Sequence, residues 1–130
     1  MTVHGVPAAY IRSAGLEGYL AEFTDAGHVT VPTLLAEIEA RDRQCWTVRD
    51  GAEIRAVALT RIVGGEYQIC EITHLTGSGL REWQDAFNEI EQWARSIGCT
   101  RIKALARPGY ERVGRRYGLK KTHVLLEKEL

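Results

Sequence analysis

This 130-residue chain lacks closely spaced pairs of cysteines. Its three cysteines, Cys45, Cys70 and Cys99, lie far apart, and no C-x-x-C motif occurs. The sequence therefore suggests neither a disulfide framework nor a cysteine-based zinc site. Each cysteine lies in or beside an apolar, strand-like run, as expected of small buried hydrophobic residues in a reducing cytosol.

Long hydrophobic runs are also missing. No window approaches the ~20 consecutive apolar residues that a membrane helix needs. The first five residues, MTVHG, lack the basic start and apolar core of a secretory signal. With 45% apolar and 26% charged residues, the composition predicts a soluble globular protein, and we expect it in the cytoplasm with no membrane partner. The length suits a single domain over residues 1–130.

Several catalytic signatures do not occur either. The chain has no G-x-S-x-G elbow, no H-E-x-x-H motif and no G-K-[ST] phosphate loop. Its four histidines are scattered without the spacing of metal ligands, so we expect no metal cofactor. No recognisable nucleic-acid-binding motif accompanies the basic residues, so a nucleic acid is not the partner we expect.

The formal net charge is zero, but the charges are unevenly distributed. Residues 1–100 hold 8 Lys/Arg against 14 Asp/Glu, whereas residues 101–130 hold 9 against 3. Most of this basic excess lies within residues 101–121 and would attract an anionic ligand or an acidic partner surface. The alternative is a solvated face that pairs with the acidic part of the same molecule.

The apolar periodicity predicts an α+β protein. Two helices are expected in the N-terminal third, the first opening at Pro7 and the second restarting at Thr30. Three strand-like runs follow, joined by turns at Asp50-Gly51 and Gly64-Gly65, which predicts an antiparallel meander. These runs cover residues 44–48, 53–63 and 66–76.

The pattern then changes to a helical spacing. Apolar residues recur every three or four positions and predict a helix over residues 80–97 that ends at Gly98; they are Trp83, Phe87, Ile90, Ala94 and Ile97. A strand over 100–106, a helix over 108–117 and a final strand over 120–130 complete the order. Strands 66–76 and 100–106 should be parallel neighbours that diverge toward residue 76.

This order resembles the GNAT acyltransferase superfamily over roughly residues 30–130. In addition to the order of helices and strands, two segments support this resemblance. They are HLTGSGLREW at 74–83 and GYERVGRRYGLKKTHVLLEKEL at 109–130. The resemblance implies a GNAT-like mixed sheet, acetyl-CoA or a related acyl-CoA as the cofactor, and an amine as the acceptor of the acyl group. It places the cofactor where strand 66–76 meets the following helix.

The resemblance also implies a set of cofactor-binding residues. The pyrophosphate would meet the loop after strand 66–76, with arginines of the C-terminal helix near the phosphates; the residues are Leu75, Gly77, Ser78, Gly79, Leu80, Arg81, Arg112 and Arg116. Backbone amides at a helix N-terminus hold anions without help from side chains. Only Gly77-x-Gly79 remains of the family's R/Q-x-x-G-x-G/A loop, so a purely structural turn is the alternative.

Proton transfer would fall to Glu71 or His74 on the same strand. Because they differ by three positions, strand alternation predicts that they point to opposite faces. Tyr110 is the nearest candidate acid, since Gly114 takes the position of the tyrosine that the family often carries. An arginine-paired Glu71, a structural His74 and a structural Tyr110 are the alternatives.

A second function class is compatible with these residues. The chain could keep the fold, lose catalysis and serve as an interaction or structural module, such as a phage-encoded or accessory protein. Its protein partner would then meet the basic face of residues 101–121.

Overall fold

One five-stranded sheet organises the fold of a computed structural model that describes residues 2–13, 15–23, 29–64, 68–77, 84–105, 111–124 and 126–130. The strand order follows the sequence. Strands β1 to β4 pair antiparallel, and β5 pairs with β4 in parallel. The strands are β1 (Thr2–Val6), β2 (Gln44–Asp50), β3 (Glu53–Val63), β4 (Gln68–Gly77) and β5 (Cys99–Ala104).

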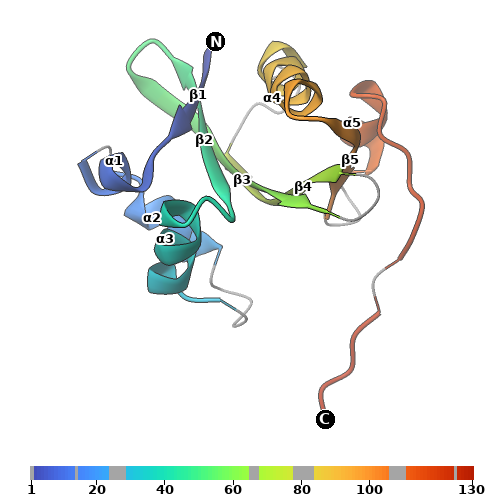
Figure 1. Cartoon of the computed structure of the whole chain (residues 1–130), viewed down its shortest axis with the longest axis horizontal. Coiled ribbons are helices and arrows are strands. Elements are labelled where there is room, and N and C mark those ends of the chain that lie inside the picture. The colour runs from blue at the N-terminus through green and yellow to red at the C-terminus, as the bar shows by residue number, and fades with distance from the viewer. Residues whose placement is uncertain are drawn as a thin grey trace.

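Helices cover both faces of this sheet (Figure 1). Three of them lie on one face and α4 lies on the other, with α5 following β5. Among the described residues, no helix has the length and apolar character to cross a bilayer. The helices are α1 (Ala8–Ser13), α2 (Glu17–Glu22), α3 (Val31–Glu39), α4 (Gln84–Ser96) and α5 (Glu111–Arg116).

Alternation along β3 separates two hydrophobic cores. Val57 and Leu59 face α1, α2 and α3, where they pack with buried leucines and isoleucines of those helices. Ala56 and Ala58 point to the opposite face, where they pack with Ile90 of α4. The side-chain period of two along a strand therefore builds both layers from one stretch of sequence.

The predicted α+β class, the meander and the strand-helix-strand unit are confirmed. As predicted, β4 and β5 are parallel neighbours, and their pairing runs from Gln68 to Ile72 on β4. The last contact is the hydrogen bond from the Leu105 amide to the Ile72 carbonyl, at 3.2 Å. Beyond Ile72, β4 continues to Gly77 without a described partner on that side.

The N-terminal prediction needs correction. Residues 2–6 form β1, a strand that was not expected, and the next stretch forms two short helices instead of one. Gly15 has a φ of +71° between α1 and α2, a conformation that ends the first helix. The second helix begins at Thr30, as predicted. Thr30 caps α3, because its hydroxyl accepts a hydrogen bond from the Thr33 amide.

The buried face of α4 is shorter than the periodicity predicted. Ile90 and Ala94 are buried, but Ile97 is 41% exposed because the helix ends at Ser96. Phe87 is half-buried, and its ring lies 4.8 Å from that of Tyr117, which follows α5. Trp83 lies outside the described residues. The assignment of Ile97 to the core was therefore wrong.

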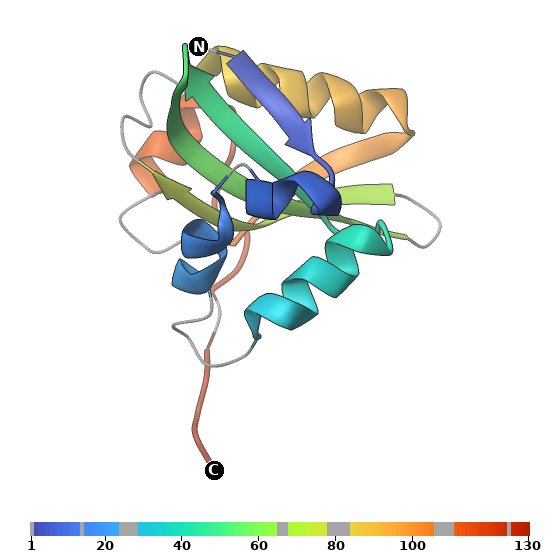
Figure 2. The ribbon, with the colours of Figure 1, turned by 90° about the vertical axis from the view of Figure 1, so that its left-hand side faces the viewer.

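The predicted final strand is absent from the described residues. Residues 120–124 and 126–130 form no helix or strand. They leave the body of the molecule after α5, in both views of the chain (Figures 1 and 2).

Candidate functional site

The candidate site lies where β5 parts from β4. At this point β4 contains a bulge, because Leu59 of β3 pairs with His74 while the next residue, Thr60, pairs with Ile72. Thr73 is the extra residue on β4. A bulge of this kind bends a strand and re-aims its side chains.

The bulge overturns one expectation about the two candidate bases. His74 is paired with Leu59, whose side chain packs against α1, α2 and α3, and Glu71 is paired with Arg61, two residues further along β3. Paired residues of antiparallel strands share a face. Glu71 and His74 therefore point to the same face, and the prediction of opposite faces was wrong because it assumed regular alternation.

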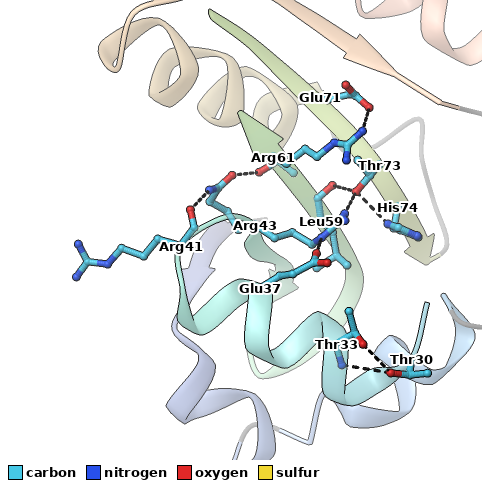
Figure 3. A network of polar contacts seen from close by, with 12 residues as sticks. Thr30, Thr33, Glu37, Arg41, Arg43, Leu59, Arg61, Glu71, Thr73 and His74 are labelled. Atoms are coloured by element: carbon cyan, nitrogen blue, oxygen red, sulfur yellow. Dashed lines mark hydrogen bonds and ion pairs between the residues drawn. The ribbon is translucent and has the colours of Figure 1, made fainter. Parts of the chain in front are cut away.

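Arg43 connects this strand to α3 (Figure 3). Its guanidinium donates a 2.6 Å hydrogen bond to the Glu37 carboxylate and a 2.5 Å hydrogen bond to the Thr73 hydroxyl. Arg43 is buried, so these partners offset the loss of its hydration. The sequence analysis missed Arg43, because nothing in the sequence distinguishes it from the exposed Arg41 two positions earlier.

Thr73 also determines the orientation of His74. Its hydroxyl donates to the Leu59 carbonyl at 3.4 Å and lies 2.9 Å from Nδ1 of His74. Since the hydroxyl has a single proton, this arrangement favours the histidine tautomer with its proton on Nδ1. Nε2 then keeps the lone pair that can accept a proton.

His74 is held in its neutral form by its surroundings. Burial lowers its pKa below the ordinary value of 6.5, and the positive charges of Arg43 and Arg61 lower it further, against an opposing effect of Glu37. The imidazole packs against the ring of Phe23, which follows α2, with the centroids 5.0 Å apart. Near neutral pH the imidazole is therefore neutral and has a nitrogen that can accept a proton, but the lowered pKa makes it a weaker base than an exposed histidine.

Glu71 is engaged by an arginine. Its carboxylate accepts a 3.0 Å hydrogen bond from Arg61, which makes the two an ion pair. The alternative of an arginine-paired carboxylate therefore describes Glu71. Of the two candidate bases, His74 has the freer proton-accepting atom.

The end of α2 covers the distal part of β4. The Thr76 hydroxyl donates a 2.6 Å hydrogen bond to the Glu22 carboxylate, one residue before the Phe23 ring that contacts His74. Leu75, a predicted cofactor contact, is 42% exposed. The α2 side of β4 is thus closed by side chains while Leu75 remains accessible.

Gly77 has a structural reason to be glycine. Its φ is +142°, and a Cβ there would lie 2.3 Å from the Arg55 carbonyl oxygen and 2.7 Å from the Ala56 backbone. This close approach to β3 does not depend on any ligand. The packing of Gly77 against β3 is therefore sufficient to require glycine at this position.

The structure describes only some of the remaining predicted site residues. Ser78, Gly79, Leu80, Arg81 and Tyr110 lie outside the described residues. Arg112 and Arg116 are exposed on α5. Within the described ranges, no group of three or more His, Cys, Asp or Glu side chains could hold a metal ion.

Comparison with known proteins gives matches in structure alone. No protein-family model matches the chain, and no curated protein matches it in sequence at a significant level. The chain is similar to glucosamine-6-phosphate N-acetyltransferase from Arabidopsis thaliana, with a TM-score of 0.74 and 12% identity over 98% of this chain and 97% of that one.

Two further solved structures show the same likeness. A predicted acetyltransferase from Clostridium acetobutylicum, solved with acetyl-CoA, has a TM-score of 0.69 and 14% identity over 98% of this chain and 95% of that one. An aminoglycoside acetyltransferase from an uncultured soil metagenomic sample, in complex with sisomicin, has a TM-score of 0.71 and 10% identity over 99% and 95%. The chain therefore has the fold of the GNAT acetyltransferases.

Proposed function

We propose that the chain is an acyl-CoA-dependent N-acyltransferase that works as one domain and acylates an amine. The observation that carries this proposal is the position of His74. This half-buried histidine with a lowered pKa follows the bulge at which β5 leaves β4. His74 thereby lies on the stretch of β4 that has no described strand partner on its β5 side. Open sheets bind ligands at such ends of parallel strands, which supports the proposal.

The gap suits the linear arm of an acyl-CoA. From Thr73 to Gly77 the β5-facing edge of β4 has no strand partner among the described residues. Backbone groups on such an edge can pair with an extended ligand that carries amide groups, as the arm of coenzyme A does. The structural neighbour solved with acetyl-CoA is consistent with this cofactor.

The phosphates would lie toward the start of α4 and toward α5. The amides of residues 77–81, at the N-terminal end of the predicted helix, would hold the pyrophosphate. Arg112 and Arg116 are exposed on α5, and their charges would favour the anionic end of the cofactor. Residues 78–81 enter this proposal from the sequence alone.

His74 would act as the general base. Nε2 takes a proton from the ammonium form of the acceptor, and the free amine then attacks the thioester carbonyl. The new C–N bond forms as the C–S bond breaks. The nitrogen loses one proton to solvent and the thiolate of coenzyme A takes up one, which gives an amide and free coenzyme A. The residue that protonates the thiolate is Tyr110 in this proposal, again from the sequence alone.

The test is an acetyl-transfer assay that measures thiol release from acetyl-CoA with a panel of amines, including amino-sugar phosphates, aminoglycosides and peptide N-termini. The wild-type chain should release thiol with at least one amine. His74→Gln should lower kcat/KM by about 10²–10⁴-fold, and His123→Gln, on the exposed C-terminal segment, should not. Binding of acetyl-CoA without turnover would instead favour the interaction or structural module.

A further inference from the structure

Arg43 is a buried arginine whose partners come from two different layers of the fold. Its exposed fraction is 9%. Its guanidinium donates to the Glu37 carboxylate of α3 and to the Thr73 hydroxyl of β4. Removing a cation from water is costly even when partners replace the water. The placement of Arg43 beside the candidate base therefore suggests a role beyond packing.

The turn that follows α3 fixes the backbone of Arg43. The Glu37 carbonyl accepts hydrogen bonds from the amides of Asp42 and Arg43, at 2.9 and 3.2 Å. Arg41, just before them, has a φ of +64°, the left-handed conformation that commonly closes the last turn of a helix. Glu37 thus holds Arg43 through its carbonyl and through its carboxylate, so α3 determines where the guanidinium lies.

The Thr73 hydroxyl is the next link, and described residues occupy all three of its hydrogen-bonding positions (Figure 3). A hydroxyl has one proton and two lone pairs. The Leu59 carbonyl can only accept, so it takes the proton, and Arg43 can only donate, so it takes one lone pair. The other lone pair is left for Nδ1 of His74, 2.9 Å away. Nδ1 must therefore donate, and Nε2 is the basic atom.

Arg43 is the main constraint on this hydroxyl. Thr73 is the extra residue of the bulge, so regular strand pairing does not hold it. A threonine can exchange its hydroxyl and methyl groups by rotation about χ1. The bond to the Leu59 carbonyl is long, at 3.4 Å, whereas the bond from the guanidinium is 2.5 Å and charge-assisted. Loss of Arg43 would therefore free the side chain that orients the imidazole.

We propose that Glu37 and Arg43 are positioning residues for His74, which hold the Thr73 hydroxyl, and through it the imidazole, in the orientation that leaves Nε2 able to accept a proton. They act through Thr73 and have no part in the proton transfer itself. The inference rests on the proposed function in so far as Nε2 is the base, but the orientation of the ring can be measured without turnover.

The same pair should leave an electrostatic signature on the imidazole. Burial is the largest cause of the lowered pKa of His74; the charge of Arg43 lowers this pKa further, and the charge of Glu37 raises it. Neutralising Arg43 and neutralising Glu37 should therefore move the pKa in opposite directions. The other charged groups around this part of β4 are Arg61 on β3, Glu71 on β4 itself and Glu22 at the end of α2.

The test follows the ring nitrogens of His74 by nitrogen NMR on the full chain, with His74→Gln to assign the signals. Above the pKa, the wild-type ring should carry its proton on Nδ1. Arg43→Met should give a mixture of both tautomers and a higher pKa. Glu37→Gln keeps an acceptor for Arg43, so it should keep the tautomer and lower the pKa. A wild-type ring protonated on Nε2 overturns the proposal, and so does an Arg43→Met ring that keeps the wild-type tautomer.

The opposite shifts distinguish positioning from a general loss of packing. A variant that only opens the site to water weakens the effect of burial, so the pKa of His74 would rise toward 6.5 in both variants. A rise in both variants therefore overturns the proposal. Arg43→Met/Glu37→Gln leaves no lone charge at this buried position, so it should fold if Arg43→Met alone does not. It too should show mixed tautomers, and a single Nδ1 tautomer there contradicts the role of the pair.

Arg41→Met is the matched control. It removes the same charge two positions earlier, from an exposed side chain that points away from this network (Figure 3). It should leave the tautomer and the pKa of His74 unchanged, and changes equal to those of Arg43→Met overturn the proposal.

Activity assays separate this inference from the proposed function. Arg43→Met should lower kcat by about tenfold or more while KM for acetyl-CoA stays within about twofold, because the ring and not the cofactor contacts are disturbed. If the NMR results hold and no amine is acylated, the proposed function fails and the inference about the ring stands. If amines are acylated and Arg43→Met keeps the wild-type kcat and pH profile, the positioning role fails.

Discussion

The ring of Phe23 lies 5.0 Å from the imidazole of His74, centroid to centroid, and the two rings are tilted by 47°. The contact joins the end of α2 to the strand that separates from β5. It removes part of the imidazole from water, and burial is the largest cause of the lowered pKa of His74. The N-terminal helices therefore contribute directly to the protonation state of the candidate base.

The stability of the chain should depend on pH through His74. The pKa of His74 in the folded state lies below 6.5. As the pH falls below about 6.5, the unfolded chain therefore binds more protons than the folded chain, and the free energy of unfolding decreases. Above about 6.5 this contribution is fully present. Urea titrations on both sides of 6.5 measure it. His74→Gln should flatten the dependence, and His123→Gln should leave it unchanged.

Thr73→Val should affect both stability and chemistry. It removes the hydroxyl that accepts from Arg43 and orients His74, and it leaves a buried guanidinium with one partner fewer. We expect a loss of about 1–3 kcal/mol in the free energy of unfolding. The exposed Thr100→Val should change it by no more than about 0.5 kcal/mol. Equal effects of the two variants would refute the role given to Thr73.

Gly77→Ala should destabilise the fold whether or not a cofactor is bound. The added Cβ would collide with the β3 backbone, at a φ of +142° that disfavours alanine. A loss of about 2 kcal/mol or more is expected in chemical denaturation. Gly64→Ala is the control, since a Cβ there meets no atom within 4 Å. An unchanged free energy of unfolding in Gly77→Ala would contradict the close packing of Gly77 against β3.

Two isoleucines of similar sequence pattern should respond differently to truncation. Ile90→Ala should cost about 2–5 kcal/mol, because the side chain is buried against the sheet. Ile97→Ala should cost less than about 1 kcal/mol, because that side chain is 41% exposed beyond the end of α4. Thermal unfolding of both variants checks the corrected face of the helix.

Much of the fold could be predicted from the sequence because its signals are local. The alternation in residues 53–63 and the helical spacing from Phe87 to Ala94 each determine an element and its buried face. The bulge at Thr73 was not predicted from the sequence. Its position depends on the partner strand, and it reversed the expectation for Glu71 and His74.

Long-range partners account for the other differences. Arg43 is buried only because Glu37 and Thr73 are both within its reach, and neither partner is evident from the sequence. Residues 2–6 form β1 by pairing with β2, far along the chain. The C-terminal segment has the pattern of a strand, but no strand forms from pattern alone without an edge to pair with.

The most direct test of the proposed activity is a calorimetric titration of the wild-type chain with acetyl-CoA. We expect saturable binding at one site per chain, with competition by free coenzyme A. Ligand at 100 times its dissociation constant should then raise the free energy of unfolding by about 2.7 kcal/mol. Absence of any binding heat or stabilisation at millimolar acetyl-CoA would contradict the assignment of the β4–β5 gap as an acyl-CoA site.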